Sequence, residues 1–445
     1  MDRRSGHSEM KKFKWTNESV TRFAKDEDPV LVMESKARKV VLAALDAGWK
    51  GPPFDPLALA ELRDIPTEAR SDIADARTVP TSKSSFKLEY NPLRPRGRLR
   101  FSIAHEIAHT LFDDCAEAVR HRGHTHAPGT DDWQLEVLCN IGAAELLMPL
   151  GSFGELADKS PSIDNVLQLR RDFDVSVEAC LIRLVKLSRR PLAAFCASSH
   201  SSGRYKLDYV IAAAGWEAPV HVGTVLPLES IVSEVTAIGF TAKGDEDWGK
   251  GVRLSVECVG LAPYPGQVTP RVVGIIRQQD ARAFEAPTLK ELKGDALQPQ
   301  TRGKLRIVAH VVPNTSAPWG GGGFAAQVRR RFPTVWSDYR RVVSSTGAAP
   351  KLGATYLGQL TEDTFIVHMV AQQGIGDSPT QRLRYAALSE CLGHLRCLAE
   401  EREASVHMPR IGTGHGGANW DLVREMIVGE LVDRGVETTV YQRPN

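Results

Sequence analysis

The residue types best suited to chemistry gather in one short segment, His105-Glu106-Ile107-Ala108-His109. Two histidines four residues apart lie on one face of a helix, so both imidazoles can reach a single metal ion. Glu106 is turned about 100° around the same helix from His105. Its carboxylate can therefore approach a water molecule on that metal, as a general base must. The segment predicts metal-assisted hydrolysis.

A catalytic zinc ion is held by three protein ligands and a water molecule, so a third ligand is needed. The helix predicted at residues 133–148 offers Glu136 and Glu145. Nine residues at about 100° each place these two carboxylates on opposite faces. The face of Glu136 also carries small side chains, at Cys139 and Asn140, which allow a neighbouring helix to come close. We therefore choose Glu136 as the ligand and expect a supporting or structural role for Glu145.

The expected cofactor is Zn2+, which would lower the pKa of a water molecule toward ~7 so that Glu106 could accept its proton. A loop after this segment contains His121, His124 and His126. We interpret the loop as solvated and mobile, with a second metal site as the alternative.

The elements that position these residues follow from hydrophobic periodicity and from breakers such as proline. Helical spacing predicts further helices, and a second helical segment has Ser176 as N-cap after a turn at Val175. This helix-turn-helix could bind DNA through Arg183 and Lys186. Its second helix is mainly apolar, however, so we expect packing against the peptidase and no direct DNA binding. The predicted ranges are helices at 33–48, 57–63, 99–112 and 163–187 (two helices), and a strand at 86–91.

Three stretches of this part resemble the ImmA/IrrE metallopeptidases: RLRFSIAHEIAHTLF, LEVLCNIGAAELLMP and DFDVSVEACLIRLVKL. The resemblance covers roughly residues 33–187. It implies zinc ligands at His105, His109 and Glu136, and a general base at Glu106. It also implies a protein substrate, a helix-turn-helix repressor whose cleavage derepresses stress or mobile-element genes. Some members carry a β-rich sensor-like domain next, where this chain has the β-prone runs YVIAA, VHVGTVLP, VRLSVECV and RVVGIIR.

The C-terminal part alternates strands and helices, which predicts a largely parallel sheet with helices on both faces. Strands are predicted at 305–312, 364–370, 405–409 and 438–441, and residues 278–293 read as a linker. Two glycine-rich turns, WGGGGF and GTGHGG, each lie between a strand and a helix. Such turns let backbone N–H groups approach phosphate oxygens, because glycine has no Cβ and tolerates positive φ. Neither is a Rossmann or a Walker loop, and two loops at one crevice would suit a diphosphate, with Asp295 free to accept from an adenine amine.

These residues resemble a macro domain, the ADP-ribose-binding fold, most like that of the poly(ADP-ribose)-activated chromatin remodeller. The terminal ADP-ribose glycohydrolase is also similar, but its catalytic lysine and aspartate have no counterpart in VAQQGIGDSP or GTGHGG. The resemblance therefore implies a reader of ADP-ribose or of an ADP-ribosylated protein. The expected ADP-ribose-binding residues are Gly294, Asp295, Asn314, Trp319, Gly320, Gly321, Gly322, Gly323, Phe324, Gly412, Thr413, Gly414, His415, Gly416 and Gly417.

Length and composition set the frame for these sites. A chain of 445 residues predicts two or three domains. A formal net charge of +2 argues against a protein that coats nucleic acid. Seven scattered cysteines without a CxxC pair, no signal peptide and no apolar run of membrane length favour a cytoplasmic protein that binds no membrane.

We therefore expect a multidomain α+β and α/β protein. Its parts are a helical, zincin-like peptidase (1–150), a helix-turn-helix segment (151–190), a β-rich sensor-like domain (191–280) and an α/β/α macro domain (294–445). The predicted activity is zinc-dependent cleavage of a regulatory protein, controlled or targeted by ADP-ribose. One alternative is an ADP-ribosyl hydrolase or reader with a regulatory peptidase part. The other is a non-enzymatic regulator with a structural zinc, which would have no need for Glu106.

Overall fold

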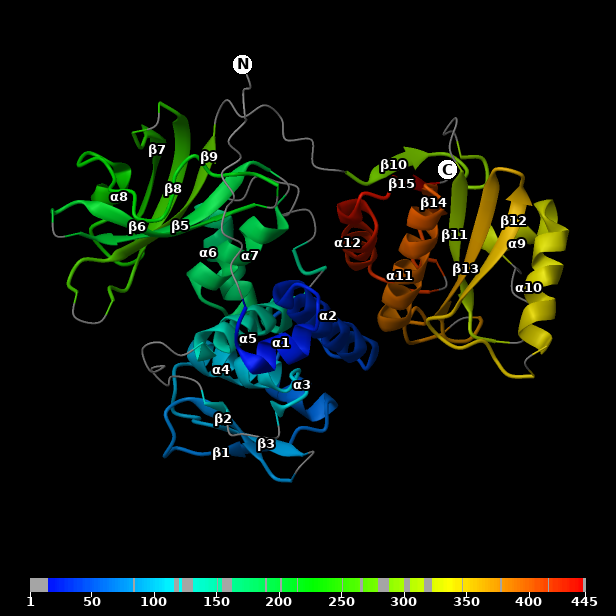
Figure 1. The fold of residues 1–445 in the computed structure, drawn as a ribbon, viewed down its shortest axis with the longest axis horizontal. Coiled ribbons are helices and arrows are strands. Elements are labelled where there is room, and N and C mark those ends of the chain that lie inside the picture. Colours follow the sequence, from blue (N-terminus) through cyan, green and yellow to red (C-terminus); the bar gives the residue numbers. More distant parts are fainter. Residues whose placement is uncertain are drawn as a thin grey trace, which may run out of the picture. The chain divides into compact units, whose positions relative to one another are not determined.

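The computed structural model describes residues 15–82, 85–115, 120–121, 131–149, 151–153, 162–188, 190–200, 202–213, 215–249, 251–264, 267–278, 288–299, 305–315, 322–345, 347–376, 378–414 and 416–442. The chain divides into two compact units, Met1–Pro149 and Leu150–Asn445. Figure 1 shows the ribbon of each part. In the described parts of the chain, no helix is both long and apolar enough to span a bilayer.

The first unit is built from helices and one small sheet. Helix α2 begins at an aspartate N-cap, Asp28, whose side chain accepts from the backbone N–H of Val30. The helices predicted at 33–48, 57–63, 99–112 and 133–148 and the strand at 86–91 are confirmed. The elements are α1 (Glu18–Ala24), α2 (Pro29–Asp46), α3 (Pro56–Leu62), α4 (Arg96–His109), α5 (Asp132–Leu147) and a sheet ordered β1 (Thr67–Ala69), β3 (Phe86–Tyr90), β2 (Ala76–Pro80), β4 (Arg120–His121).

Helices α4 and α5 pack closely where both carry small side chains. A Cβ added at Gly142 of α5 would lie 2.8 Å from the Cβ of Ala108 in α4 and 2.9 Å from the Sδ of Met33 in α2. Both Ala104 and Ala108 are fully buried. The short side chains therefore let two helices approach with the spacing that a shared metal site needs.

The second unit begins with the predicted helix-turn-helix, α6 (Ile163–Phe173) and α7 (Val177–Leu187). Ser176 accepts from the N–H of Ala179, which confirms the predicted N-cap. The pair contacts an antiparallel sheet ordered β6 (Tyr205–Ala212), β5 (Leu192–Ser199), β9 (Arg271–Gln278), β8 (Arg253–Leu261), β7 (Thr241–Asp247), beside the short α8 (Ile231–Glu234).

Two carboxylates join these helices to the sheet. Glu257 of β8 accepts from the N–H of Ile163 at the start of α6 (3.0 Å), and Glu178 of α7 accepts from the hydroxyl of Tyr209 (2.9 Å). Arg183, one of the two residues considered for base contacts, is only 5% exposed. Arg183 is therefore used for packing, whereas Lys186, the other residue considered, is exposed.

One β-prone run of this region does not form a strand. Residues 220–227, VHVGTVLP, make turns and a single isolated bridge from Val225 to Lys206. Gly223 adopts a φ of +85° and Pro227 lacks an N–H, so the run cannot sustain a ladder.

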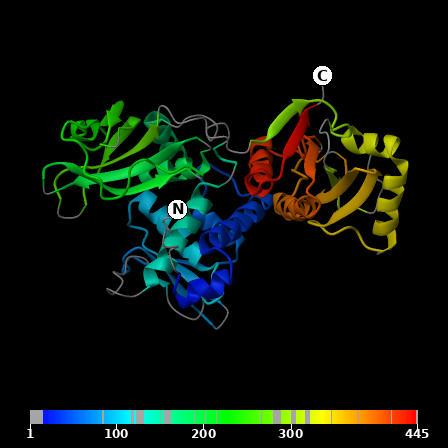
Figure 2. The same cartoon turned by 45° about the horizontal axis from the view of Figure 1, so that its top comes forward.

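The C-terminal part is a six-stranded sheet that is parallel except for the β12–β13 pair. Its helices lie on both faces, α9 and α10 on one and α11 and α12 on the other (Figures 1 and 2). The predicted alternation is confirmed. The strand order is β10 (Lys290–Lys293), β15 (Thr438–Gln442), β14 (Ser405–Pro409), β11 (Arg306–Pro313), β13 (Thr364–Gln372), β12 (Thr355–Thr361), and the helices are α9 (Gly323–Arg331), α10 (Pro333–Ser345), α11 (Tyr385–Glu401), α12 (Trp420–Glu430) and the short η3 (Val432–Arg434).

The linker interpretation of residues 278–293 is wrong at its C-terminal end, because β10 pairs in parallel with β15. All four residues of β10, KELK, are exposed. An edge strand that buries no side chain leaves no hydrophobic pattern, so it is invisible in the sequence.

Candidate metal centre and glycine-loop edge

Helices α4 and α5 bring three of the predicted residues together. The Nε2 atoms of His105 and His109 lie 3.2 Å apart. The carboxylate of Glu136 reaches both, at 3.0 Å from His105 Nε2 and 3.4 Å from His109 Nε2. Each histidine is 1% exposed. Two imidazole nitrogens and a carboxylate thus converge on one point.

The hydrogen bonds behind the histidines decide which ring nitrogens face that point. The amide oxygen of Asn140, which can only accept, lies 3.0 Å from His105 Nδ1 and suits the ring form that carries its proton on this nitrogen. In that form, the one a metal ligand adopts, the Nε2 atom of His105 presents a lone pair toward His109 and Glu136. Two nitrogen lone pairs and a carboxylate this close together repel one another unless a cation lies between them. The donor set fits zinc.

Cys139 is a competing ligand candidate. The ligand atoms of His105, His109 and Cys139 also lie within 4.8 Å of one another. The thiol sulfur, however, lies 3.2 Å from His109 Nδ1, the nitrogen opposite the one that faces His105. A metal ion held by both Nε2 atoms is therefore better completed by Glu136, with Cys139 orienting the His109 ring.

Glu106 lies beside this cluster and is fully buried. Its Oε2 atom accepts a hydrogen bond of 2.9 Å from the hydroxyl of Thr78 in β2. Its Oε1 atom has no hydrogen-bond partner among the described residues. Burial raises the pKa of Glu106, against the opposing effect of His109 and His105. For Glu136 burial also acts to raise the pKa, but its contacts with His105 and His109 outweigh this and hold it below the usual range.

Sequence reasoning missed the role of Thr78. Strand β2, ARTVP, has no pronounced alternation, and a threonine in such a strand carries no chemical signal. The sequence suggests only small side chains at Asn140 and Cys139, whereas Asn140 contacts His105 and Cys139 contacts His109. Glu145 is buried in α5 at 3% exposure. Among the loop histidines, His121 falls in β4, and His124 and His126 lie outside the described residues.

The predicted ADP-ribose site falls at the carboxyl edge of the six-stranded sheet. The segments after β10, β11, β13 and β14 leave the sheet at one edge, because these strands are parallel. Strand β11 lies between β14 on one side and β13 on the other, so the connections that follow it run to opposite sides of the sheet. Open α/β sheets bind ligands at the carboxyl end of such a strand. Helix α9 starts at Gly322 without a side-chain cap, which leaves its first N–H groups for an anion. Trp319, Gly320, Gly321 and His415 lie outside the described residues.

Hydrogen bonds tie the described loops of this edge together. Asn314 after β11 accepts from the N–H of Gly374 after β13 (2.9 Å). The carbonyl oxygen of Gly416 accepts from the N–H groups of Arg382 and Leu383, both at 3.0 Å. A Cβ at Gly416 would lie 2.5 Å from the carbonyl oxygen of Gly412, so only glycine fits there. Close backbone contacts therefore link the described parts of these loops.

The sequence predicts a carboxylate of Asp295 that is free for an adenine amine, but the structure shows both of its oxygens engaged. Its Oδ1 atom accepts from the N–H of Leu297 (2.9 Å), and its Oδ2 atom accepts from Arg331 at the end of α9. An adenine amine would have to share the carboxylate with both groups.

Comparisons with known proteins match the two ends of the chain to different families. The family model of the IrrE N-terminal-like domain, peptidase M78, matches residues 76–185. The radiation response metalloprotease IrrE of Deinococcus deserti is 33% identical over 109 residues, which are 24% of this chain and 38% of that protein.

The other matches concern a separate stretch. The mouse chromodomain-helicase-DNA-binding protein 1-like is 28% identical over 172 residues, which are 36% of this chain. This chain spans only 18% of that protein's length. A solved macrodomain protein from Streptomyces coelicolor is 32% identical over its full length, covering 35% of this chain at a TM-score of 0.31. Residues 76–185 thus match the IrrE N-terminal-like domain of peptidase M78, and the chain is also similar to macrodomain proteins.

Proposed function

We propose that this protein is a zinc-dependent endopeptidase whose metal ligands are His105, His109 and Glu136. The observation that carries the proposal is the convergence of two Nε2 atoms and one carboxylate within 3.0–3.4 Å of one another. Glu106 beside them supports a catalytic centre, because a purely structural zinc site has no use for a second, buried carboxylate that is not a ligand.

Each side chain has a separate task in peptide hydrolysis. Bound zinc would act as a Lewis acid that activates water and polarises the scissile carbonyl. Glu106 accepts the proton of the attacking water and passes it to the leaving amine, so it serves in turn as general base and general acid. Thr78 holds one oxygen of Glu106 in place. Asn140 and Cys139 fix the orientation of the two imidazole rings.

The proposed substrate is a regulatory protein, a helix-turn-helix repressor, and the proposed input is ADP-ribose or an ADP-ribosylated protein at the glycine-loop edge. Two features support the input. The described glycine loops leave one edge of a parallel sheet, and α9 begins there with an uncapped N-terminus. The similarity to a macrodomain protein points to the same ligand. The metalloprotease relative, named for radiation response, supports a regulatory role for cleavage.

The test measures metal content and cleavage in the full chain. We expect about one zinc per chain, cleavage of a candidate repressor and loss of cleavage with a chelator. Glu106→Gln should keep the zinc and lose cleavage. Glu136→Ala should lose the zinc on dialysis, whereas Cys139→Ser should keep it with affinity lowered by about 10- to 100-fold at most. Cleavage by the Glu106→Gln variant, or loss of zinc by Cys139→Ser but not by Glu136→Ala, would overturn the assignment.

A further inference from the structure

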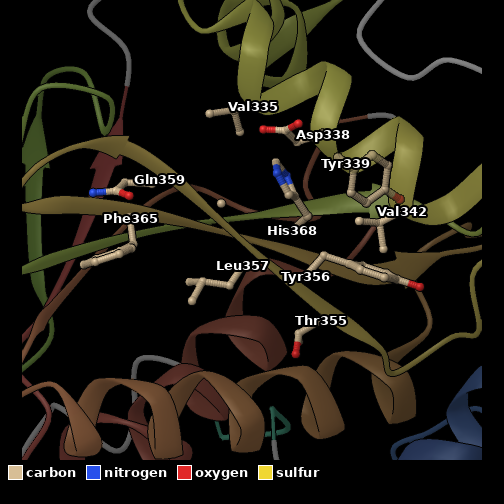
Figure 3. A pocket seen from close by; sticks show the side chains of 11 residues that line it. Val335, Asp338, Tyr339, Val342, Thr355, Tyr356, Leu357, Gln359, Phe365 and His368 are labelled. Carbon is tan, nitrogen blue, oxygen red and sulfur yellow. The ribbon is translucent and has the colours of Figure 1, made fainter.

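The macro domain has a groove of about 500 Å³ away from its glycine loops. Figure 3 shows it between α10 on one side and strands β12 and β13 on the other. One face of α10 lines it, with residues at helical spacing, together with two residues of β13 and five consecutive residues of β12. The lining residues are Val335, Asp338, Tyr339, Val342, Thr355, Tyr356, Leu357, Gly358, Gln359, Phe365 and His368.

The groove follows the backbone of an edge strand. Among the described strands, β12 is last in the sheet and pairs only with β13. Side chains of a strand point alternately to the two faces, so five consecutive lining residues mean that the groove runs along the strand itself. The sequence of β12, TYLGQLT, contains neither a charge nor a proline, two devices that protect an edge from pairing, and its register with β13 is regular from Thr355 to Gln359 and shifts only after that. Leu357 is 43% exposed, and Val342 across the groove is 46% exposed.

The chemistry of the walls selects a cationic side chain. Asp338 is the one charged lining residue, and the ring of Tyr339, next to it in α10, lies 5.4 Å from the ring of Tyr356, whereas the Phe365 ring is already contacted by Arg402. A carboxylate near aromatic rings attracts an ammonium or guanidinium group by charge and by the ring quadrupole. Asp338 already accepts from Arg341 one turn along α10, at 2.9 Å. Both side chains are more than 60% exposed, and such a pair contributes at most about 1 kcal/mol, so a ligand can compete for the carboxylate.

The floor of the groove is rigid. His368 lies there, 1% exposed, and its Nδ1 atom is 2.6 Å from Nε2 of His310 on the neighbouring strand. Burial lowers the pKa of His310 to about 3, and burial lowers that of His368 as well, so neither ring is charged at neutral pH. At Gly358 the strand is closely packed, since an added Cβ would lie 3.0 Å from Cγ1 of Val335 in α10 and 3.1 Å from Cγ2 of Ile366. The floor therefore repels no cation and offers polar atoms.

We propose that this groove binds an extended peptide segment of a partner protein, with a lysine or arginine side chain directed at Asp338. The peptide backbone adds a strand to the edge of β12, as in other complexes formed by strand addition. A span of five β12 residues corresponds to a peptide of about five residues. The apolar side chains of the peptide cover Leu357 and Val342. This groove would bind a peptide backbone, whereas the glycine-loop edge is proposed to bind a nucleotide. None of the residues that line the groove belongs to the expected ADP-ribose site.

The test uses the full chain and a fluorescently labelled peptide, acetyl-Val-Thr-Lys-Thr-Val-amide, with binding followed by anisotropy. Replacing lysine by arginine should preserve binding, and replacing it by glutamate should abolish it. Replacing the central threonines by N-methyl threonine should also abolish binding, because it removes N–H donors. Asp338→Asn should weaken binding on the order of tenfold. Leu357→Lys, which places a cation at the edge, should abolish it.

The matched control is Asp421→Asn, at an exposed carboxylate in the first turn of α12, which should bind the peptide as the parent does. The proposal fails if neither the lysine nor the arginine peptide binds, or if Asp338→Asn binds as tightly as Asp421→Asn. It fails too if lysine amide alone binds as tightly as the peptide, since that would indicate a small-cation site. Competition by ADP-ribose would place the peptide at the glycine loops and would also exclude the groove.

Discussion

Among the described residues, one hydrogen bond from a neutral hydroxyl group orients the carboxylate of Glu106. Thr78 donates to Oε2, while Oε1 has no partner among the described residues. A buried carboxylate with one oxygen held and the other uncommitted is suited to taking up a proton, because one fixed oxygen sets the direction of the other. Thr78 is thus a positioning residue for the proposed general base.

We predict that Thr78→Val lowers kcat for peptide cleavage by about 10- to 100-fold, since a hydrogen bond to a charged group contributes about 1.5–3 kcal/mol. KM and zinc content should stay close to the parent's, because Thr78 contacts neither proposed ligand nor solvent. Thr78→Ser keeps the hydroxyl and should restore most of kcat. Steady-state kinetics with metal analysis checks this. A Thr78→Val enzyme with kcat within twofold of the parent's would show that Glu106 is held by other means.

At the scale of elements, the metal centre is a property of two helices at close range. The histidines come from α4 and the carboxylate from α5, and Gly142 lies where α5 contacts both Ala108 of α4 and Met33 of α2. Glycine in a helix interior costs about 0.5–1 kcal/mol relative to alanine. The residue is explained by packing, because even one methyl group would push α4 and α5 apart.

We predict that Gly142→Ala destabilises the protein by about 1–3 kcal/mol despite its better helix propensity, as overpacking does. The zinc affinity should fall as well, because the ligands would separate. The control is Gly97→Ala in the first turn of α4, where an added Cβ meets nothing within 4 Å. This variant should be as stable as the parent or more so. Urea unfolding and zinc titration measure both effects, and a stabilised Gly142→Ala would contradict the packing argument.

The macro domain's sheet shows a similar dependence on neighbouring elements. Its glycine loops leave one edge only because β14 lies beside β11, although β12, β13 and α11 separate them in the chain. The groove lies along β12, the outermost strand of the sheet, which has a neighbouring strand on one side only. Each proposed binding region therefore depends on the order of the strands in the sheet, and no single segment of the chain forms it alone.

At the scale of the molecule, the cluster of His105, His109 and Glu136 lies in the first compact unit, and the glycine-loop edge lies in the second. The proposed control of cleavage by ADP-ribose is a coupling between two sites. Coupling free energies of this kind are typically about 1–3 kcal/mol, a change of roughly 5- to 150-fold, and for binding they are reciprocal.

We predict that saturating ADP-ribose changes the cleavage rate of the full chain by at least about fivefold. In the Glu106→Gln variant, bound substrate should change the affinity for ADP-ribose by a comparable factor, whereas affinity without substrate should equal the parent's. Calorimetry and a cleavage assay check both statements. If the rate is the same with and without ADP-ribose, the macro domain tethers or reads a partner without controlling the peptidase.

The sequence by itself determined much of the local structure and the reacting groups. The pattern His105-Glu106-x-x-His109 specifies a helix and a hydrolytic metal site, because the period of the α-helix alone puts both imidazoles on one face. The same period separated Glu136 from Glu145, and the structure brings Glu136 to the histidines. Alternating apolar segments likewise predicted most strands and helices of the macro domain.

Only the tertiary structure decided what depends on distant neighbours. Thr78 lies 28 residues before Glu106 and is brought to it by the packing of β2 on α4. Asp295 is bound by Arg331, 36 residues away. Strand β10 forms because its backbone pairs with that of β15. The groove at β12 forms because α10 packs beside the outermost strand of the sheet. Side-chain period is local, whereas hydrogen bonds and close packing between segments are set by the fold as a whole.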